Sequence, residues 1–185
     1  RYPMRRRVAG YFVGAFFFAL FFGGGWAEAW CAGLAGLACG ACLACLEQAG
    51  GNAFLSTLAS AFVLGTASCA MRALGAPISL EVTLAGGIMV LVPGLVFTNF
   101  MSNLLTGDMV SGLATFARAL LSAAAIALGA GAAMALFQGL WPVQAGGSTA
   151  AYPPAVACLL AYVACLGFCL PVNAQGLGAV LCGLG

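Results

Sequence analysis

Residues 91–112 read LVPGLVFTNFMSNLLTGDMVSG, and this stretch decides which folds the chain can adopt. An apolar run is interrupted by Pro93 and Gly94 and then carries Asn99 and Asn103 before a Gly-Asp turn. Proline has no backbone N–H to donate, so a helix that passes through it loses one hydrogen bond. Glycine lets another backbone or a substrate approach closely. We therefore predict a broken helix, which is either a simple kink or part of a site.

The composition places this break in a lipid bilayer. Of the 185 residues, 64% are hydrophobic, six are basic and four are acidic. A soluble domain carries about a quarter charged residues, so this chain cannot cover a water-exposed surface. The apolar runs are too long for the alternating strands of a membrane barrel. We predict an all-α integral membrane protein, and the net charge of +2 does not indicate a nucleic-acid partner.

Runs of about 20 apolar residues, the length needed to cross a bilayer, recur along the chain. A loop rich in Gly, Pro, Ser and Thr follows at 138–153. We expect a polytopic bundle of about five to six transmembrane helices plus a further, truncated helix. The expected spans are 8–22, 27–46, 54–73, 79–100, 110–137 and 154–170, with 174–185 as the truncated segment.

Basic residues set the expected orientation, because they favour the cytoplasmic side of a first span. Four of the six arginines lie within the first seven residues, which predicts a cytoplasmic N-terminus and a cytoplasmic turn at Asp108. Arg72, in a loop then predicted outside, counts against it. A signal peptide cleaved after Ala29 is the alternative. We reject it because more membrane helix follows, and because a chain that starts without Met is expected to be a piece of a longer protein.

Cys39, Cys42 and Cys45 have the spacing C-x-x-C-x-x-C, which holds iron–sulfur clusters in some loops. Here the three lie in an apolar run rich in Ala and Gly, and the chain contains no His. Free Cys behaves as a small hydrophobic residue. We predict neither a metal site nor a cofactor. The chain also lacks a nucleophile–base pair, so we do not expect an enzyme.

Polar side chains are arranged by helical period on both sides of the Gly-Asp turn. Asn99 and Asn103 are four residues apart and share a face. In the next span, steps of 3, 4, 3 and 4 predict one polar stripe. Its members are Asp108, Ser111, Thr115, Arg118 and Ser122. The alternative for the asparagines is simple hydrogen bonding between helices, which contributes about 0.6–2 kcal/mol each.

Arg118 lies about 8 residues, or roughly 12 Å, into its expected span. A charge at the centre of a membrane helix costs from about 2.5 to 10 kcal/mol or more. Arg118 therefore extends toward the cytoplasm, pairs with Asp108 or Glu81, or binds a substrate carboxylate through its planar fork. Glu28 and the other two glutamates lie near expected helix ends, where a charge stays in water. Asp108 precedes a helix, where the dipole favours an acid.

These residues carry a resemblance to a known family. Between 91 and 118, a Pro-Gly, an Asn, a Gly-Asp, a Ser-Gly and an Arg stand in the order and spacing typical of the threonine/serine exporter family. They are Pro93, Gly94, Asn99, Gly107, Asp108, Ser111, Gly112 and Arg118. The tail, 159–185, is similar to the start of the family's second membrane half. The first half is also similar to one subunit of two-component exporters implicated in succinate export.

The resemblance implies a first membrane half at 1–137, a linker at 138–153 and the start of the second half at 154–185. It implies that a cytoplasmic region upstream and several helices downstream are missing here. The family usually has an acid where Asn103 stands, so coupling or substrate is expected to differ. Proton coupling would then rest on Asp108 or Glu81.

The expected function is a secondary exporter of small polar metabolites in the inner or plasma membrane, driven by a proton gradient, with threonine and serine first. Alternatives are a small dicarboxylate (succinate) exporter and a non-transporting membrane scaffold subunit. The expected substrate path contains Pro93, Gly94, Asn99, Asn103, Asp108, Ser111 and Arg118. The expected partners are the small-molecule substrate, the lipid bilayer and the missing second half or a partner subunit, with a homo-oligomer left open.

Overall fold

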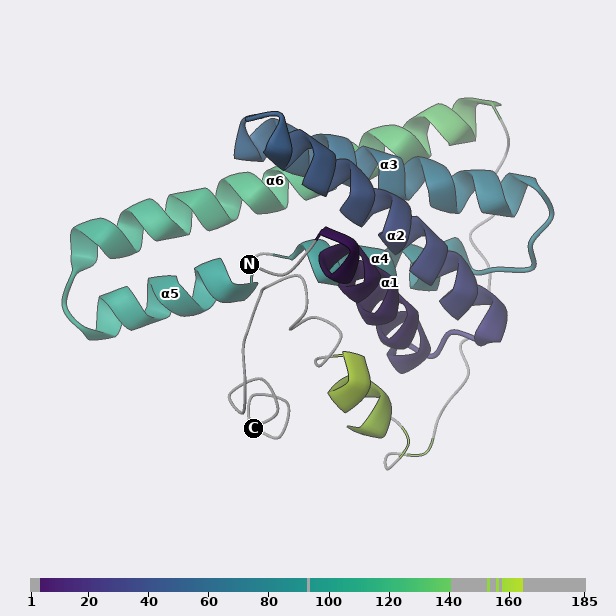
Figure 1. Ribbon diagram of the computed structural model, residues 1–185, viewed down its shortest axis with the longest axis horizontal. Coiled ribbons are helices and arrows are strands. Elements are labelled where there is room, and N and C mark those ends of the chain that lie inside the picture. Colours follow the sequence, from purple (N-terminus) through teal and green to yellow (C-terminus); the bar gives the residue numbers. More distant parts are fainter. Residues whose placement is uncertain (1–3, 93, 141–152, 154–155, 157, 165–185) are drawn as a thin grey trace.

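The structure, a computed structural model, describes residues 4–92, 94–140, 153, 156 and 158–164 (Figure 1). Every regular element in this part of the chain is helical, which confirms the all-α prediction. A short helical segment lies within 158–164. The helices are α1 (Met4–Phe21), α2 (Trp26–Gln48), α3 (Ala53–Ala73), α4 (Leu80–Leu91), α5 (Gly94–Leu105) and α6 (Met109–Leu140).

Three of these helices are long and apolar enough to cross a membrane: α2, α3 and residues Met109–Phe137 of α6. The pair α4 and α5 together would supply a fourth crossing. The apolar part of α1, Val8–Phe21, is shorter. A polytopic helical membrane protein is therefore confirmed by the lengths and composition of its helices.

The predicted broken span at 79–100 is present as two helices whose axes are bent by 50°. The first ends at Leu91, and the second begins at Gly94 and continues to Leu105. Pro93 stands between them in the sequence. Because proline has no backbone N–H to donate, the helix cannot continue unbroken. The helix before the expected linker also runs three residues further than predicted, to Leu140. The rest of the linker, except residue 153, and most of the expected span at 154–170 lie outside the described residues.

Small residues let the helices of the bundle approach closely. A Cβ built on Gly36 of α2 would lie 2.6 Å from the Cβ of Ala15 on α1, and one on Gly86 of α4 would lie 2.8 Å from Ala19. Gly40, one helical turn after Gly36, packs on the ring of Tyr11. Lipid offers no hydrophobic driving force between helices, so close packing of this kind holds them together. The Gly36-x-x-x-Gly40 spacing on α2 therefore serves the packing of α1 against α2.

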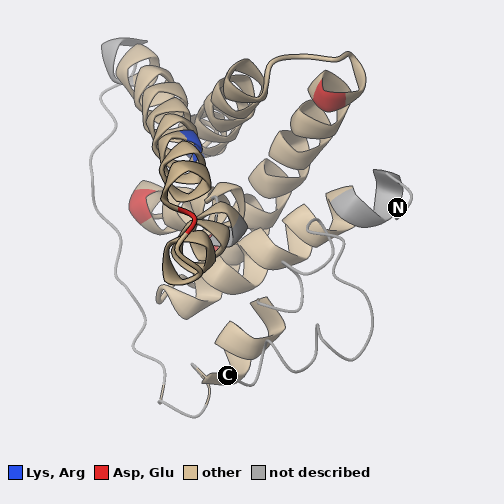
Figure 2. Cartoon of the chain, turned by 90° about the vertical axis from the view of Figure 1, so that its left-hand side faces the viewer, with Lys and Arg blue, Asp and Glu red and all other residues tan. Residues whose placement is uncertain are grey.

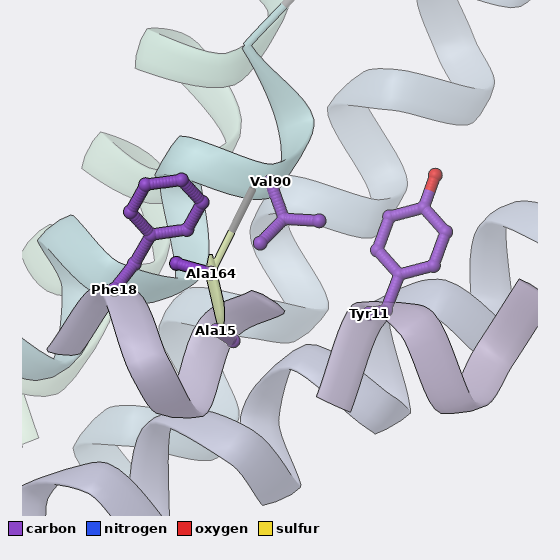
Figure 3. Packing of buried hydrophobic residues seen from close by; sticks show 5 residues of the cluster. All are labelled: Tyr11, Ala15, Phe18, Val90 and Ala164. Carbon is purple, nitrogen blue, oxygen red and sulfur yellow. The ribbon is translucent and has the colours of Figure 1, made fainter. Parts of the chain in front are cut away.

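The interior of the bundle joins segments that are distant in the sequence. Tyr11, Ala15 and Phe18 of α1 pack against Val90 at the end of α4 and against Ala164 (Figure 3). Because Val90 lies one residue before the end of α4, this cluster fixes α4 just ahead of the bend.

Helix α6 packs on α3 in the parallel sense. A Cβ on Gly129 would lie 2.4 Å from the carbonyl oxygen of Leu58, and one on Gly65 would lie 2.6 Å from the Cβ of Ala133. The residue numbers at these contacts therefore increase in the same direction along both helices. Because Leu58 lies beside Gly129, the first residue of α3 is level with about residue 124 of α6. The N-terminal end of α6 therefore extends about 15 residues, or roughly 22 Å, beyond the start of α3. Together with α5, this part of α6 projects from the bundle as a hairpin (Figure 1).

Candidate functional site

The polar hairpin, defined here as α5, the turn at 106–108 and residues 109–123 of α6, contains most of the predicted site. Its turn depends on Gly107, which has a φ of +83°, a conformation that residues with a Cβ rarely adopt. Asp108 follows, and its Oδ1 accepts the backbone N–H of Ser111 at 3.1 Å. Asp108 therefore caps the start of α6, where an acid also interacts well with the helix dipole. Its side chain is exposed.

Asn103 joins the two helices of the polar hairpin. Its Nδ2 donates to the Oγ of Ser111 at 3.3 Å and to the Oγ1 of Thr115 at 3.4 Å. The Thr115 hydroxyl in turn donates to the carbonyl oxygen of Ser111 at 2.7 Å. The sequence pattern predicted that these residues of α6 share a face, and the structure shows that this face meets α5 through Asn103.

Aromatic rings hold the hairpin together on the side nearer the bend. The rings of Phe100 and Phe116 lie 4.9 Å apart between their centroids, and Phe97 makes an edge contact with each of them. Gly112 of α6 faces the side chain of Leu104 of α5. The antiparallel pairing of α5 with α6 is thus fixed by rings at one level and by amide–hydroxyl bonds nearer the turn.

Arg118 is exposed on α6, and its carbonyl oxygen accepts the Ser122 hydroxyl at 3.1 Å. Within the described residues its guanidinium forms no ion pair, so one of the three alternatives for Arg118, pairing with Asp108 or Glu81, is not found. Charged groups are sparse and scattered over the helices (Figure 2). Arg118 lies in the part of α6 that extends beyond α3.

The other predicted site residues lie further from the contact between Asn103 and Ser111. Asn99 is exposed on α5, one helical turn before Asn103. Gly94 begins α5 directly after the break. Pro93 lies outside the described residues. Glu81 is exposed in the first turn of α4, about 10 residues and roughly 15 Å along that helix from the break. The structure therefore brings together Asn103, Asp108 and Ser111, and leaves Glu81 apart.

Glu28 is the residue that the sequence reading placed wrongly. It was expected in water near a helix end, but its side chain is 8% exposed. Its Oε1 accepts both the N–H and the hydroxyl of Ser79, each at 3.3 Å. The available signal was the glycine run at 23–25, three residues before it, because residues without side chains allow α4 to approach the start of α2.

The cysteines of α2 do not converge on one point. Cys39 is buried in a cluster with Ala35 and Leu64, whereas Cys45 is exposed. Among the described residues, no group of three or more His, Cys, Asp or Glu side chains is positioned to hold a metal ion. These thiols pack as small apolar groups where they are buried.

The helices, the bend between α4 and α5 and the polar hairpin define a polytopic helical membrane protein with polar groups gathered beside a broken helix. The chain belongs to the ThrE family, whose model, described as "Putative threonine/serine exporter", matches residues 1–137. Neither the curated proteins nor the solved structures gave a match to the chain. Membership implies a multi-pass transport protein, rather than an enzyme, that handles a small molecule in a lipid environment.

Proposed function

We propose that this protein is part of a secondary exporter that moves threonine and serine out of the cell, driven by a proton gradient. The observation that carries the proposal is the polar hairpin, which lies within the matched residues 1–137. It presents amide, hydroxyl, carboxylate and guanidinium groups on two paired helices directly after a broken helix. Broken helices of this kind expose backbone groups to substrates in other transporters.

The proposed substrate path runs along the hairpin from Pro93 and Gly94 to the turn. An amino acid carries a carboxylate, an ammonium group and, in threonine and serine, a hydroxyl. Arg118 would bind the carboxylate, since its planar fork matches that group. Asp108, roughly 15 Å away along α6, would attract the ammonium group as the substrate enters at the turn, before its carboxylate reaches Arg118. The amides of Asn99 and Asn103, with the hydroxyl of Ser111, would hold the substrate hydroxyl.

The length of α6 indicates where a substrate would enter. A helix of 32 residues is about 48 Å long, whereas the hydrocarbon core of a bilayer is about 30 Å thick. Part of α6 therefore leaves the core or tilts strongly within it. The end that carries Asp108 and Arg118 extends beyond α3, so it is the end that reaches water. In the orientation proposed from the N-terminal arginines, this end faces the cytoplasm, where an exported substrate is loaded.

The hairpin also exposes large apolar side chains near its turn. Leu105 is 89% exposed, Val110 84% and Met109 73%. We propose that the second membrane half, supplied by the same longer chain or by a partner subunit, covers this region and closes the path. A second copy of the chain is the alternative occupant of this surface. The competing function is that of a non-transporting membrane scaffold subunit.

A second candidate substrate is a small dicarboxylate such as succinate. The observation that favours it is the neutral Asn103, which donates to two hydroxyls at the position where an acid would serve an ammonium group. An arginine on the same predicted helical stripe as Ser111 and Thr115 suits an anion without an amine.

Efflux from cells that lack their own exporters tests the function. The full-length parent is expressed, and loss of preloaded threonine, serine and succinate is measured, with Arg118→Ala and Arg118→Lys alongside. We expect threonine and serine efflux, abolished by Arg118→Ala and partly kept by Arg118→Lys. Efflux of succinate alone would establish the second candidate. No efflux of any of the three would support the scaffold role.

A further inference from the structure

Glu28 differs from every other acid of the chain in its surroundings. The chain has four acidic residues, all within the described ranges, and the other three are exposed. Glu28 is buried in the first turn of α2, beside a partner that is also buried, Ser79 at 4% exposure. An ionisable side chain inside a membrane protein is costly to maintain and therefore marks a functional site more often than a structural one.

The contacts of Glu28 join α2 to the start of α4. Ser79 is the N-cap residue of α4, and its own side chain does not cap the helix. Glu28 performs that role from another helix, because its Oε1 accepts both the N–H and the hydroxyl of Ser79 at 3.3 Å. Through these two hydrogen bonds the side chain of Glu28 links the first turn of α2 to the start of α4.

The space around the carboxylate is tight. A Cβ on Gly25 would lie 2.9 Å from the Oε2 of Glu28, and one on Gly24 would lie 2.8 Å from Val82 of α4. The backbone beside Ser79 is fixed from a third helix, because Arg72 of α3 donates from Nη1 to the carbonyl oxygen of Ile78. The described titratable or charged side chains on the elements around Glu28 are Cys31 on α2, Arg72 at the end of α3 and Glu81 in the first turn of α4. The adjoining part of α1, at Ala19, adds no charged side chain.

The position of Glu28 along the bundle is opposite to that of the polar hairpin. The turn at 106–108 lies at the end where α3 begins, since α6 and α3 are parallel. Glu28 lies where α2 begins and α3 ends. Twenty residues of α2, roughly 30 Å, separate it from Gln48 at the other end. One end thus carries the groups proposed to load substrate, and the other carries a buried carboxyl group within one turn of an exposed helix start at Trp26.

We propose that Glu28 is the group that takes up and releases the coupling proton, a role that rests on the proposed function as a proton-driven exporter. A proton from water binds the carboxylate, and the charge that holds α2 to the N-terminus of α4 disappears. Helix α4 then moves relative to α2, and because α4 leads through the bend into α5, this movement reaches the polar hairpin. Asp108 and Glu81 are poorer candidates, because both are exposed and Asp108 caps α6.

The test uses the full-length parent, purified and reconstituted in proteoliposomes. Threonine uptake and release are measured with and without an imposed pH gradient, together with proton movement by an internal pH-sensitive dye. Glu28→Gln keeps an oxygen that accepts from Ser79 but cannot ionise. Glu47→Gln removes an exposed carboxylate from the same helix and is the matched control. Gly25→Ala displaces Oε2 without altering the carboxyl group, and Gly131→Ala, with open space around it, is its control.

We expect Glu28→Gln to retain exchange of labelled for unlabelled threonine while losing both the stimulation by the gradient and the accompanying proton movement. Gly25→Ala should weaken that stimulation, and both controls should behave like wild type. Proton movement in Glu28→Gln equal to that of wild type would overturn the proposal. If Glu28→Gln loses exchange as well, Glu28→Asp decides: restored, gradient-dependent transport supports the proposal, and transport that ignores the gradient overturns it. A wild-type protein without any threonine flux would overturn the proposed function itself.

Discussion

The Nδ2 of Asn103 lies 3.3 Å from the Oγ of Ser111, and this amide–hydroxyl bond joins the two helices that follow the break. The two residues are eight positions apart in the sequence and on opposite sides of a tight turn. Their contact brings together two polar patterns, one on each helix. We therefore expect the residue at position 103 to influence both the stability of the hairpin and the chemistry of the proposed path.

Replacing Asn103 by Ala should destabilise the polar hairpin by about 1 kcal/mol, since hydrogen bonds between membrane helices average about 0.6 and reach about 1.7 kcal/mol. Thermal unfolding of the purified full-length protein in detergent measures the change. A double-mutant cycle with Thr115→Ala isolates the bond between these two residues. Strictly additive effects of the two substitutions would show that the contact at 3.4 Å contributes nothing.

Replacing Gly107 by Ala should also lower stability, by about 1 kcal/mol or more, because its φ of +83° is strained for any residue with a Cβ. Asn tolerates this conformation better than Ala. We therefore expect Gly107→Asn to retain more of the melting temperature than Gly107→Ala. Equal melting temperatures for the wild type and both variants would mean that the turn has another conformation.

Gly129→Ala tests the close packing of α6 on α3. The added methyl would lie 2.4 Å from the backbone oxygen of Leu58, which cannot move without displacing α3. Overpacking of this kind costs about 1–3 kcal/mol. Gly131→Ala, two residues later and with open space around it, is the control and should leave the melting temperature unchanged. A Gly129→Ala protein as stable as this control would contradict the close contact between Gly129 and Leu58.

Cysteine labelling tests the orientation of the bundle. Since α3 and α6 are parallel, the turn before each of them lies at the same end. In a background without reactive cysteines, Glu47→Cys and Asp108→Cys should react with a membrane-impermeant reagent from one side only, and that side should be the cytoplasm. Labelling of the two positions from opposite sides would refute the arrangement of the helices, whereas labelling of both from outside would reverse only the orientation.

The helices up to residue 140 could be anticipated closely from local patterns. Apolar runs placed five helical regions within a few residues of their observed ends, and Pro93 with Gly94 marked the break. The stripe containing Ser111 and Thr115 followed from helical period alone. These features are properties of single segments, because the length of an apolar run and the lack of a proline N–H act without any partner.

The contacts between segments required the tertiary structure. No local pattern shows that Asn103 donates to α6, that α6 is parallel to α3, or that Arg118 has no ion pair within the described chain. Glu28 is the clearest example: read locally, it is a glutamate near a helix start, where water would solvate it. It is buried because Ser79, 51 residues later, brings the start of α4 against it. The sequence by itself determined the solvent, the helices and the break, since these depend on composition and backbone chemistry. Only the tertiary structure decided which polar groups meet, because that depends on how the helices pack.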